Sequence, residues 1–232
     1  PYMKILISSD LHYPYAHKDS LEFLKAVKSW LKPDRVVNIG DEVDYHAISF
    51  HDKDPDLDNA TQELLRARDD IKKLEKVFPK MDLLHSNHGS LVFRKRKFYG
   101  LPDYIIKDYA DILDVNKKNW KWHDKLILKD KFGSYYFVHN MNKDPMKSSM
   151  SIGMNLIQGH FHTDFCTKFW SSPEALRFGM TVGCLIDKDS LAFAYSRVNI
   201  RRPILGCAVI EDGIPQLIPC VLERGNRWSG KI

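Results

Sequence analysis

Five short polar stretches of the sequence carry the residues whose types and spacing could do chemistry. Each stretch follows or ends a predicted apolar strand, and together they hold two Asp, one Asn and five His residues. Carboxylate, amide and imidazole groups in this mixture bind divalent transition-metal ions, and their number is close to what two adjacent ions need. The stretches are Asp10-Leu11-His12, Gly40-Asp41, Asn87-His88, His139 and Gly159-His160-Phe161-His162.

Apolar strands have to bring the first stretches together. Residues 3–9 and 35–39 read as buried strands, and the segment between them has apolar residues at helical spacing. This β-α-β order predicts parallel strands joined by a right-handed crossover. Because ligands of such sheets lie beyond the carboxyl ends of the strands, we expect Asp10 and Asp41 at one edge.

The later stretches follow strands of the same kind. A predicted helix at 60–78 precedes a strand at 81–85, which delivers Asn87-His88 to the same edge. Two more strands are predicted at 135–138 and 154–157, and they end at the last two polar stretches. All five stretches are therefore expected to converge.

From about residue 165 to residue 222, helical periodicity disappears. Short apolar segments separated by Pro, Gly and Asp turns predict a second, mostly antiparallel sheet that packs on the first. The polar and basic tail at 223–232 is expected to be disordered. The predicted segments are 165–170, 180–186, 191–197, 205–211 and 215–222.

Composition is that of a globular protein. The chain has 232 residues, 44% of them hydrophobic and 28% charged, which suits a single domain over residues 1–232. No apolar run approaches the roughly 20 residues of a membrane span, and the opening apolar run is too short for a signal peptide. We therefore expect a cytoplasmic protein with no membrane partner. The four scattered cysteines are expected to be reduced core residues.

The order of the polar stretches resembles that of the calcineurin-like metallophosphoesterase superfamily. The matching pattern is Asp-x-His, Gly-Asp-x-x-Asp (Gly40 to Asp44), Asn-His, His and Gly-His-x-His, and it spans residues 10–162. The size of the chain and the loop after Asp41 are most similar to the compact phage and bacterial members. The resemblance implies a mixed α/β fold, a four-layer α-β-β-α sandwich with two mixed sheets.

The resemblance also implies roles for the residues. One ion would be held by Asp10, His12 and His162, a second by Asn87, His139 and His160, and Asp41 would bridge them. Manganese is the first expectation for both ions, with iron, zinc, nickel or cobalt as alternatives. A hydroxide that bridges the ions would attack the phosphoester, and His88 would protonate the leaving oxygen.

One block of the family pattern is altered, at two positions. The acidic residue that usually follows the Asn-His pair is replaced here by Gly89, and the preceding Gly by Ser86. A carboxylate at this point would orient the ring of His88 or raise its pKa. Its loss leaves the orientation and strength of the general acid as an open question.

The basic run Arg94-Lys95-Arg96-Lys97, followed by Phe98-Tyr99, begins six residues after His88. Either it is a solvated loop, or Arg94 and Arg96 contact a phosphate backbone beside aromatic stacking. His46, five residues past Asp41, is a further candidate for substrate contact.

Together these features favour a phosphodiesterase or nuclease acting on DNA, RNA or a nucleotide diester. The alternative is a phosphomonoesterase of nucleotides or phosphoproteins. A non-catalytic scaffold is a third hypothesis, which predicts eroded ligands, whereas every ligand is present. The sequence does not define the oligomeric state.

Overall fold

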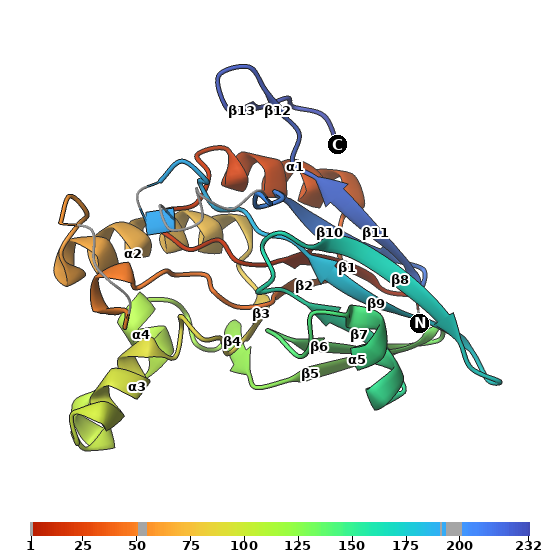
Figure 1. The fold of residues 1–232 in the computed structure, drawn as a ribbon, viewed down its shortest axis with the longest axis horizontal. Coiled ribbons are helices and arrows are strands. Elements are labelled where there is room, and N and C mark those ends of the chain that lie inside the picture. Colours follow the sequence, from red (N-terminus) through yellow and green to blue (C-terminus); the bar gives the residue numbers. More distant parts are fainter. Residues whose placement is uncertain (1, 51–54, 191, 194–200) are drawn as a thin grey trace.

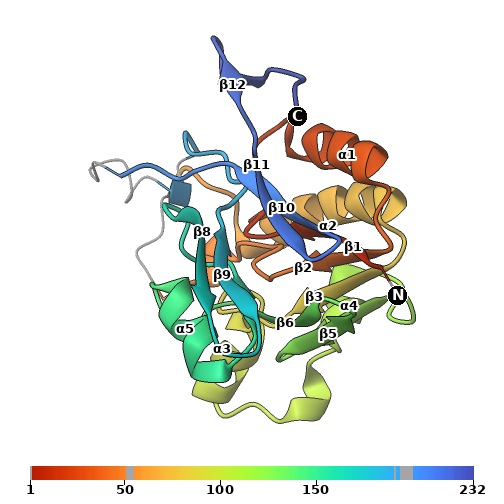
Figure 2. The same ribbon diagram turned by 90° about the vertical axis from the view of Figure 1, so that its right-hand side faces the viewer.

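Two mixed β-sheets form the centre of the molecule (Figures 1 and 2). The structure, a computed structural model, describes residues 2–50, 55–190, 192–193 and 201–232. The first sheet has the strand order β11-β10-β1-β2-β3-β4, in which β1 to β4 are parallel and β10 and β11 antiparallel. Its strands are β1 (Lys4–Ser8), β2 (Arg35–Asn38), β3 (Met81–Leu84), β4 (Trp120–His123), β10 (Gly206–Glu211) and β11 (Ile214–Pro219).

The second sheet has the order β5-β6-β7-β9-β8. Strand β7 is parallel to both β6 and β9, while β5 and β8 are antiparallel edge strands. Its strands are β5 (Leu126–Asp130), β6 (Gly133–Val138), β7 (Asn155–Gln158), β8 (Phe165–Ser171) and β9 (Leu176–Val182).

The prediction for residues 165–222 was partly wrong. The segments at 205–211 and 215–222 form β10 and β11 of the first sheet, where Lys4 pairs with Glu211. The second sheet instead takes β6 and β7, so it is mixed and not mostly antiparallel. Residues 191 and 194–197 of the segment predicted at 191–197 lie outside the described residues.

Successive side chains of β1 point to opposite faces of the first sheet, and this explains the layers of the fold. Ile5 and Ile7 face the second sheet in one apolar core, whereas Leu6 faces the helices on the other side in a second core. Helices α1 and α2 cover that outer face, and α5 covers the outer face of the second sheet (Figure 2). The result is the predicted α-β-β-α sandwich. The helices are α1 (Ser20–Leu31), α2 (Ala60–Val77), α3 (Leu91–Phe98), α4 (Tyr109–Leu113) and α5 (Pro145–Ile152).

The C-terminal tail is ordered, contrary to the prediction. It forms a hairpin of β12 (Leu222–Glu223) and β13 (Arg227–Trp228) beside α1. Arg227 donates two hydrogen bonds of 2.8 Å to the carboxylate of Asp19, which also accepts from the backbone of Trp228 at 2.9 Å. Asp19 precedes α1 but makes no capping hydrogen bond, because its side chain holds the tail instead.

Two further predictions concern the whole chain. The four cysteines are free, and all but Cys166 are buried. In the part of the chain that the structure describes, no helix is both long and apolar enough to cross a membrane.

Candidate metal centre

The five polar stretches converge at the carboxyl ends of the central strands, as predicted. Asp10 follows β1, Asp41 follows β2, His88 follows β3, His139 follows β6 and His160 follows β7. Several of these turns are tight enough to need a left-handed backbone: φ is between 50° and 67° at Asp10, His12, Asp41 and His160. L-residues adopt this conformation at a cost of about 1–3 kcal/mol each, and such residues cluster at functional sites.

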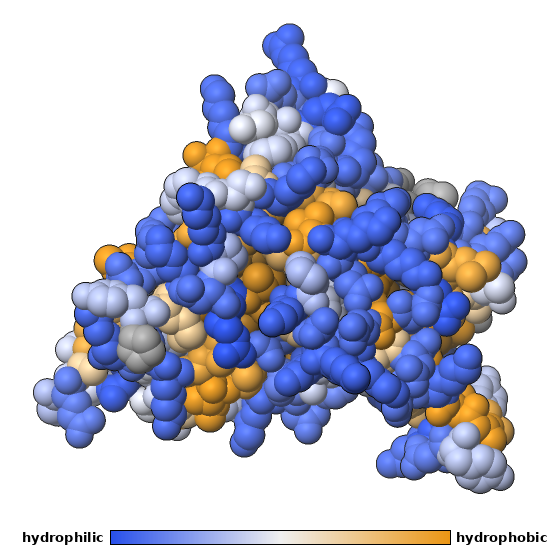
Figure 3. All heavy atoms as spheres, turned by 180° about the vertical axis from the view of Figure 1, so that it is seen from behind, coloured by the Kyte–Doolittle hydropathy of each residue, from blue (hydrophilic) through white to orange (hydrophobic). Residues whose placement is uncertain are grey.

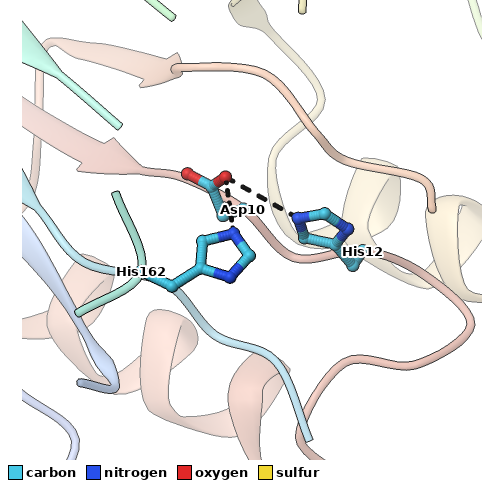
Figure 4. A group of neighbouring side chains, drawn as sticks. All are labelled: Asp10, His12 and His162. Atoms are coloured by element: carbon cyan, nitrogen blue, oxygen red, sulfur yellow. Dashed lines mark hydrogen bonds and ion pairs between the residues drawn. The ribbon is translucent and has the colours of Figure 1, made fainter. Parts of the chain in front are cut away.

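Asp10, His12 and His162 form the first group of candidate ligands (Figure 4). Asp10 Oδ1 lies 3.1 Å from His162 Nε2 and 3.7 Å from His12 Nε2. The first two residues are buried, and the three donor atoms lie within 4.8 Å of one another. A single cation could contact all three.

Asp41, His139 and His160 form the second group. Asn87 completes it, because its Oδ1 lies 2.7 Å from His139 Nε2 and 3.2 Å from His160 Nδ1. Asp41 also lies between the groups: its Oδ2 is 3.3 Å from His139 Nε2 and 3.6 Å from His12 Nε2. One carboxylate therefore faces an imidazole of each group.

The hydrogen bonds of the imidazoles direct lone pairs into the site. His139 Nδ1 donates to the carbonyl of Ile39 at 2.7 Å, so Nε2 presents its lone pair to oxygen atoms that are themselves acceptors. His12 Nδ1 donates to Asp44 Oδ1 at 2.6 Å, and its buried Nε2 has no hydrogen-bond partner. Acceptors that face one another in a buried site are stabilised by a proton or a metal ion between them.

The electrostatics agree with this requirement. Burial lowers the pKa of His12, but the carboxylates of Asp10 and Asp44 outweigh it and raise that pKa to about 10. Burial also lowers the pKa of His139, but the carboxylate of Asp41 outweighs burial and raises that pKa to about 9. The pKa of Asp41 is lowered, because its imidazole neighbours outweigh the effect of burial. The site thus attracts positive charge, from protons or from metal ions.

Two glycines leave room for the ligands. A side chain on Gly159 would begin 1.9 Å from Ser9 Oγ and 2.6 Å from Asp10 Oδ2. Gly40 has a φ of 94°, and a side chain there would begin 2.6 Å from Ser86 Cβ. Both positions therefore require glycine if the ligands are to approach one another this closely.

The structure shows how His88 is oriented without an acidic residue at position 89. His88 Nδ1 donates to the backbone carbonyl of Asp44 at 2.5 Å, and its backbone N–H donates to Asp41 Oδ1 at 3.0 Å. A side chain on Gly89 would begin 3.1 Å from both Ser86 Oγ and Tyr109 Oη. Asp44 therefore takes over the orienting role, which leaves Nε2 of His88 available to a substrate.

A cavity of about 250 Å³ opens over the candidate ligands. Asp41, Asn87 and both imidazoles of the Gly-His-x-His stretch line it, together with His88. Phe193 and Arg201 also line the cavity, and Arg201 Nη1 lies 3.6 Å from Asp164 Oδ1. A guanidinium at this position can bind an anionic ligand that enters the cavity.

The three residues predicted to contact substrate are placed differently from one another. Arg94 Nη2 donates to the backbone carbonyl of Asn87 at 2.7 Å, so it lies beside the candidate centre. Arg96 is turned away and pairs with Asp103 at 2.5 Å. His46 is mostly buried, with Nδ1 3.9 Å from Asp44 Oδ2, and it does not line the cavity.

Several contributors to the site were not predicted from the sequence. Ser86 Oγ accepts from the backbone of Asp41 at 3.0 Å and of Gly89 at 3.1 Å, and Ser9 donates to the carboxylate of Asp10. Phe193 packs edge-on against His12 at 5.5 Å between ring centroids. Ser9 precedes Asp10 and Ser86 precedes Asn87, so each serine adjoins a predicted ligand in the sequence, but Phe193 has no local signal.

A buried carboxylate holds the loop that carries Asp44 and His46. Glu63, in the first turn of α2, is 3% exposed and accepts from the backbone of His46 at 2.6 Å and of Ala47 at 2.7 Å. Burial raises the pKa of Glu63 from its ordinary value of 4.5 to about 7, and the two backbone hydrogen bonds offset only part of this effect.

We expect the stability of the protein to depend on the protonation of Glu63. The pKa of Glu63 is higher in the folded than in the unfolded protein. Protonated Glu63 therefore contributes fully to the free energy of unfolding below pH 4.5, and this contribution is lost as the pH rises through about 7. The side chain of Glu63→Gln stays neutral at every pH. Between these pH values the free energy of unfolding in urea should therefore fall by about 2–3 kcal/mol more in wild type than in this variant. Glu22→Gln, at an exposed site on α1, should behave as wild type. An unchanged pH dependence in Glu63→Gln would contradict the assignment.

Comparison with known proteins gives structural neighbours only. No protein-family model matches the sequence, and no curated protein is significantly similar to it. An archaeal phosphodiesterase superposes with a TM-score of 0.50 and 13% identity, over 94% of this chain and 99% of that chain. For YfcE, a phosphoesterase from E. coli, the TM-score is 0.49 and the identity 10%, over 94% and 93%. Vacuolar protein sorting 29 from Cryptosporidium parvum superposes with a TM-score of 0.46 and 12% identity, over 93% of this chain and 95% of that chain. The likeness to the archaeal enzyme confirms the predicted fold.

Proposed function

We propose that this chain, which has the fold of a phosphodiesterase, is itself a phosphoester hydrolase that binds two divalent cations and acts on nucleic-acid diesters. The position of Asp41 carries the proposal, because its Oδ2 lies 3.6 Å from His12 and 3.3 Å from His139. Two-metal hydrolytic sites need a shared ligand of this kind, since their ions lie roughly 3.5–4 Å apart.

The donor set fits such a pair of ions. The first group offers one carboxylate and two imidazoles, and the second offers two imidazoles and the amide oxygen of Asn87. Nitrogen and oxygen donors without thiolates favour manganese, with iron, zinc, nickel or cobalt as alternatives. When bound, the ions would act as Lewis acids on phosphate oxygens and lower the pKa of a water to roughly 7.

The remaining chemistry belongs to side chains of the chain. His88 is fixed through Nδ1 on the carbonyl of Asp44, so Nε2 is the atom that can protonate a leaving oxygen. In the free protein burial lowers the pKa of His88, and His12 lowers it further. The negative charge of a bound phosphoester favours the doubly protonated ring and so supplies the proton donor.

Two arginines support a diester as substrate. Arg94 lies beside Asn87, and Arg201 lines the cavity. A diester has substituents on both sides of the phosphorus, and cationic side chains beyond the cavity can bind the neighbouring phosphates of a polymer.

The test is a comparison of two chromogenic substrates with manganese-reconstituted protein. We expect bis(p-nitrophenyl) phosphate to be hydrolysed faster than p-nitrophenyl phosphate, and we expect EDTA to abolish both activities. Faster hydrolysis of the monoester would assign a phosphomonoesterase in place of a phosphodiesterase. If neither substrate is hydrolysed with any of the metals named, the proposed activity is wrong.

A further inference from the structure

A basic and aromatic arm projects from the molecule next to the candidate metal centre (Figure 1, α3). We define the arm as α3, the turn after it and the 3₁₀ turn η2 (Asp103–Ile105), together with Phe50, which packs on it. Its rings are unusually exposed for aromatic side chains: Phe50 is 53%, Phe98 71%, Tyr99 67% and Tyr104 87% exposed. Figure 3 shows apolar atoms on this projection, at the lower right.

Cations and aromatic rings contact one another on the arm. Lys95 Nζ lies 3.7 Å above the centroid of the Phe50 ring, and the guanidinium carbon of Arg94 lies 5.7 Å from it. Phe50 packs edge-on against Phe98 at 6.2 Å, and Phe98 against Tyr99 at 5.2 Å. Exposed rings beside Lys and Arg are what proteins use to stack unpaired bases and neutralise the adjacent phosphates.

The arm is connected directly to the candidate centre. Helix α3 begins three residues after His88, and the backbone N–H of Leu91 donates to the carbonyl of His88 at 2.9 Å. Arg94 joins the arm to Asn87 through its 2.7 Å hydrogen bond. A polymer bound along the arm would therefore reach the cavity.

We propose that the arm is a platform for single-stranded nucleic acid, on which bases stack while the adjoining diester lies at the metal centre. This inference rests on the proposed function, because it names the substrate of that site. The exposed rings favour a single strand over a duplex, since paired bases cannot present their faces to Phe98 and Tyr99. Stacking is also indifferent to base identity, so binding should show little sequence preference.

A second basic surface provides a control for charge. A groove of about 620 Å³ lies at the opposite, amino ends of β2, β3 and β4, and Lys118 and Lys121 are among the residues that line it. Among the described residues that line it, the one aromatic, Phe78, is 1% exposed and cannot stack with a base. Charge reversal at the two lysines changes the net charge as much as reversal at Lys95 and Lys97 does.

The experiment measures fluorescence anisotropy of a labelled oligothymidylate with metal-free protein in EDTA, so that binding is separated from hydrolysis. We expect Phe98→Ala to weaken binding about tenfold. Phe169→Ala removes another exposed ring (52%) from β8 and should leave the affinity unchanged. Lys95→Glu/Lys97→Glu should weaken binding far more than Lys118→Glu/Lys121→Glu. Thermal melting of each variant verifies folding.

Several results would overturn the inference. Equal affinity of wild type and Phe98→Ala would exclude stacking, and so would equal affinity for an abasic strand of the same length. Tighter binding of a duplex would exclude a single-strand platform.

Hydrolysis of bis(p-nitrophenyl) phosphate by wild type is measured in parallel. If the diester is hydrolysed but the oligothymidylate does not bind, the platform is wrong and the proposed function stands. If the strand binds but no diester is hydrolysed, the proposed function fails and the bound strand is not a substrate.

Discussion

Replacing Asp41 by Asn is expected to remove bound metal and hydrolytic activity together. The amide keeps the size of the side chain and tolerates the left-handed backbone at this position, whose φ is 50°. It lacks the negative charge that two adjacent cations need from a shared ligand. Since metal ions supply several kcal/mol of transition-state stabilisation, we expect activity to fall on the order of 10³-fold or more.

Metal content and rate are measured on the same preparation. Elemental analysis after manganese reconstitution should show less than the wild-type amount of metal in Asp41→Asn. The matched control is Asp111→Asn on α4, a half-exposed carboxylate 3.4 Å from Lys117 Nζ, which should keep both metal and activity. An Asp41→Asn protein with full activity would exclude a bridging role for this residue.

Replacing His88 by Gln is expected to separate chemistry from metal binding. The carbonyl of Asp44 holds the ring of His88, and the carboxylate of Asp41 holds its backbone N–H. His88 could also join His12 and Asp44 around a cation, but the proposed pair of ions leaves it out of the ligand set. We expect Gln to leave the metal content unchanged and to lower the turnover number by about 10²–10⁴-fold, the usual contribution of a general acid.

The leaving group provides the sharper readout. A p-nitrophenolate departs without much protonation, whereas the sugar oxygen of a dinucleotide needs a proton donor. The loss in His88→Gln should therefore be larger for the dinucleotide. His85→Gln, an exposed histidine three residues earlier, should have no effect on either substrate. Equal losses on both substrates would show that His88 does not act as the proton donor.

The convergence of the candidate ligands was predictable because they lie at the ends of strands that are recognisable locally. The β-α-β order brings Asp10 and Asp41 to one edge of a parallel sheet, and no long-range information is needed for that step. The departure at Gly89 could also be seen in the sequence, but its consequence could not. Only the folded chain shows that the carbonyl of Asp44 holds the His88 ring.

What could not be predicted depends on contacts between distant segments. Strand β10 pairs with β1 across about two hundred residues, and an apolar strand carries no local mark of which sheet it will join. Asp19 directly precedes α1, where a carboxylate commonly caps a helix, yet its carboxylate binds Arg227. Similarly, Arg96 reads as a phosphate ligand but pairs with Asp103.

The left-handed turns at the centre bear on how such a protein can change over evolutionary time. Asp10, His12, Asp41 and His160 all occupy a backbone conformation that asparagine adopts more readily than most residues. Asparagine codons differ from those of aspartate and histidine by one nucleotide. A single point mutation can therefore replace a candidate ligand while the turn that carried it persists, so a lineage could lose the proposed catalysis long before it loses its architecture.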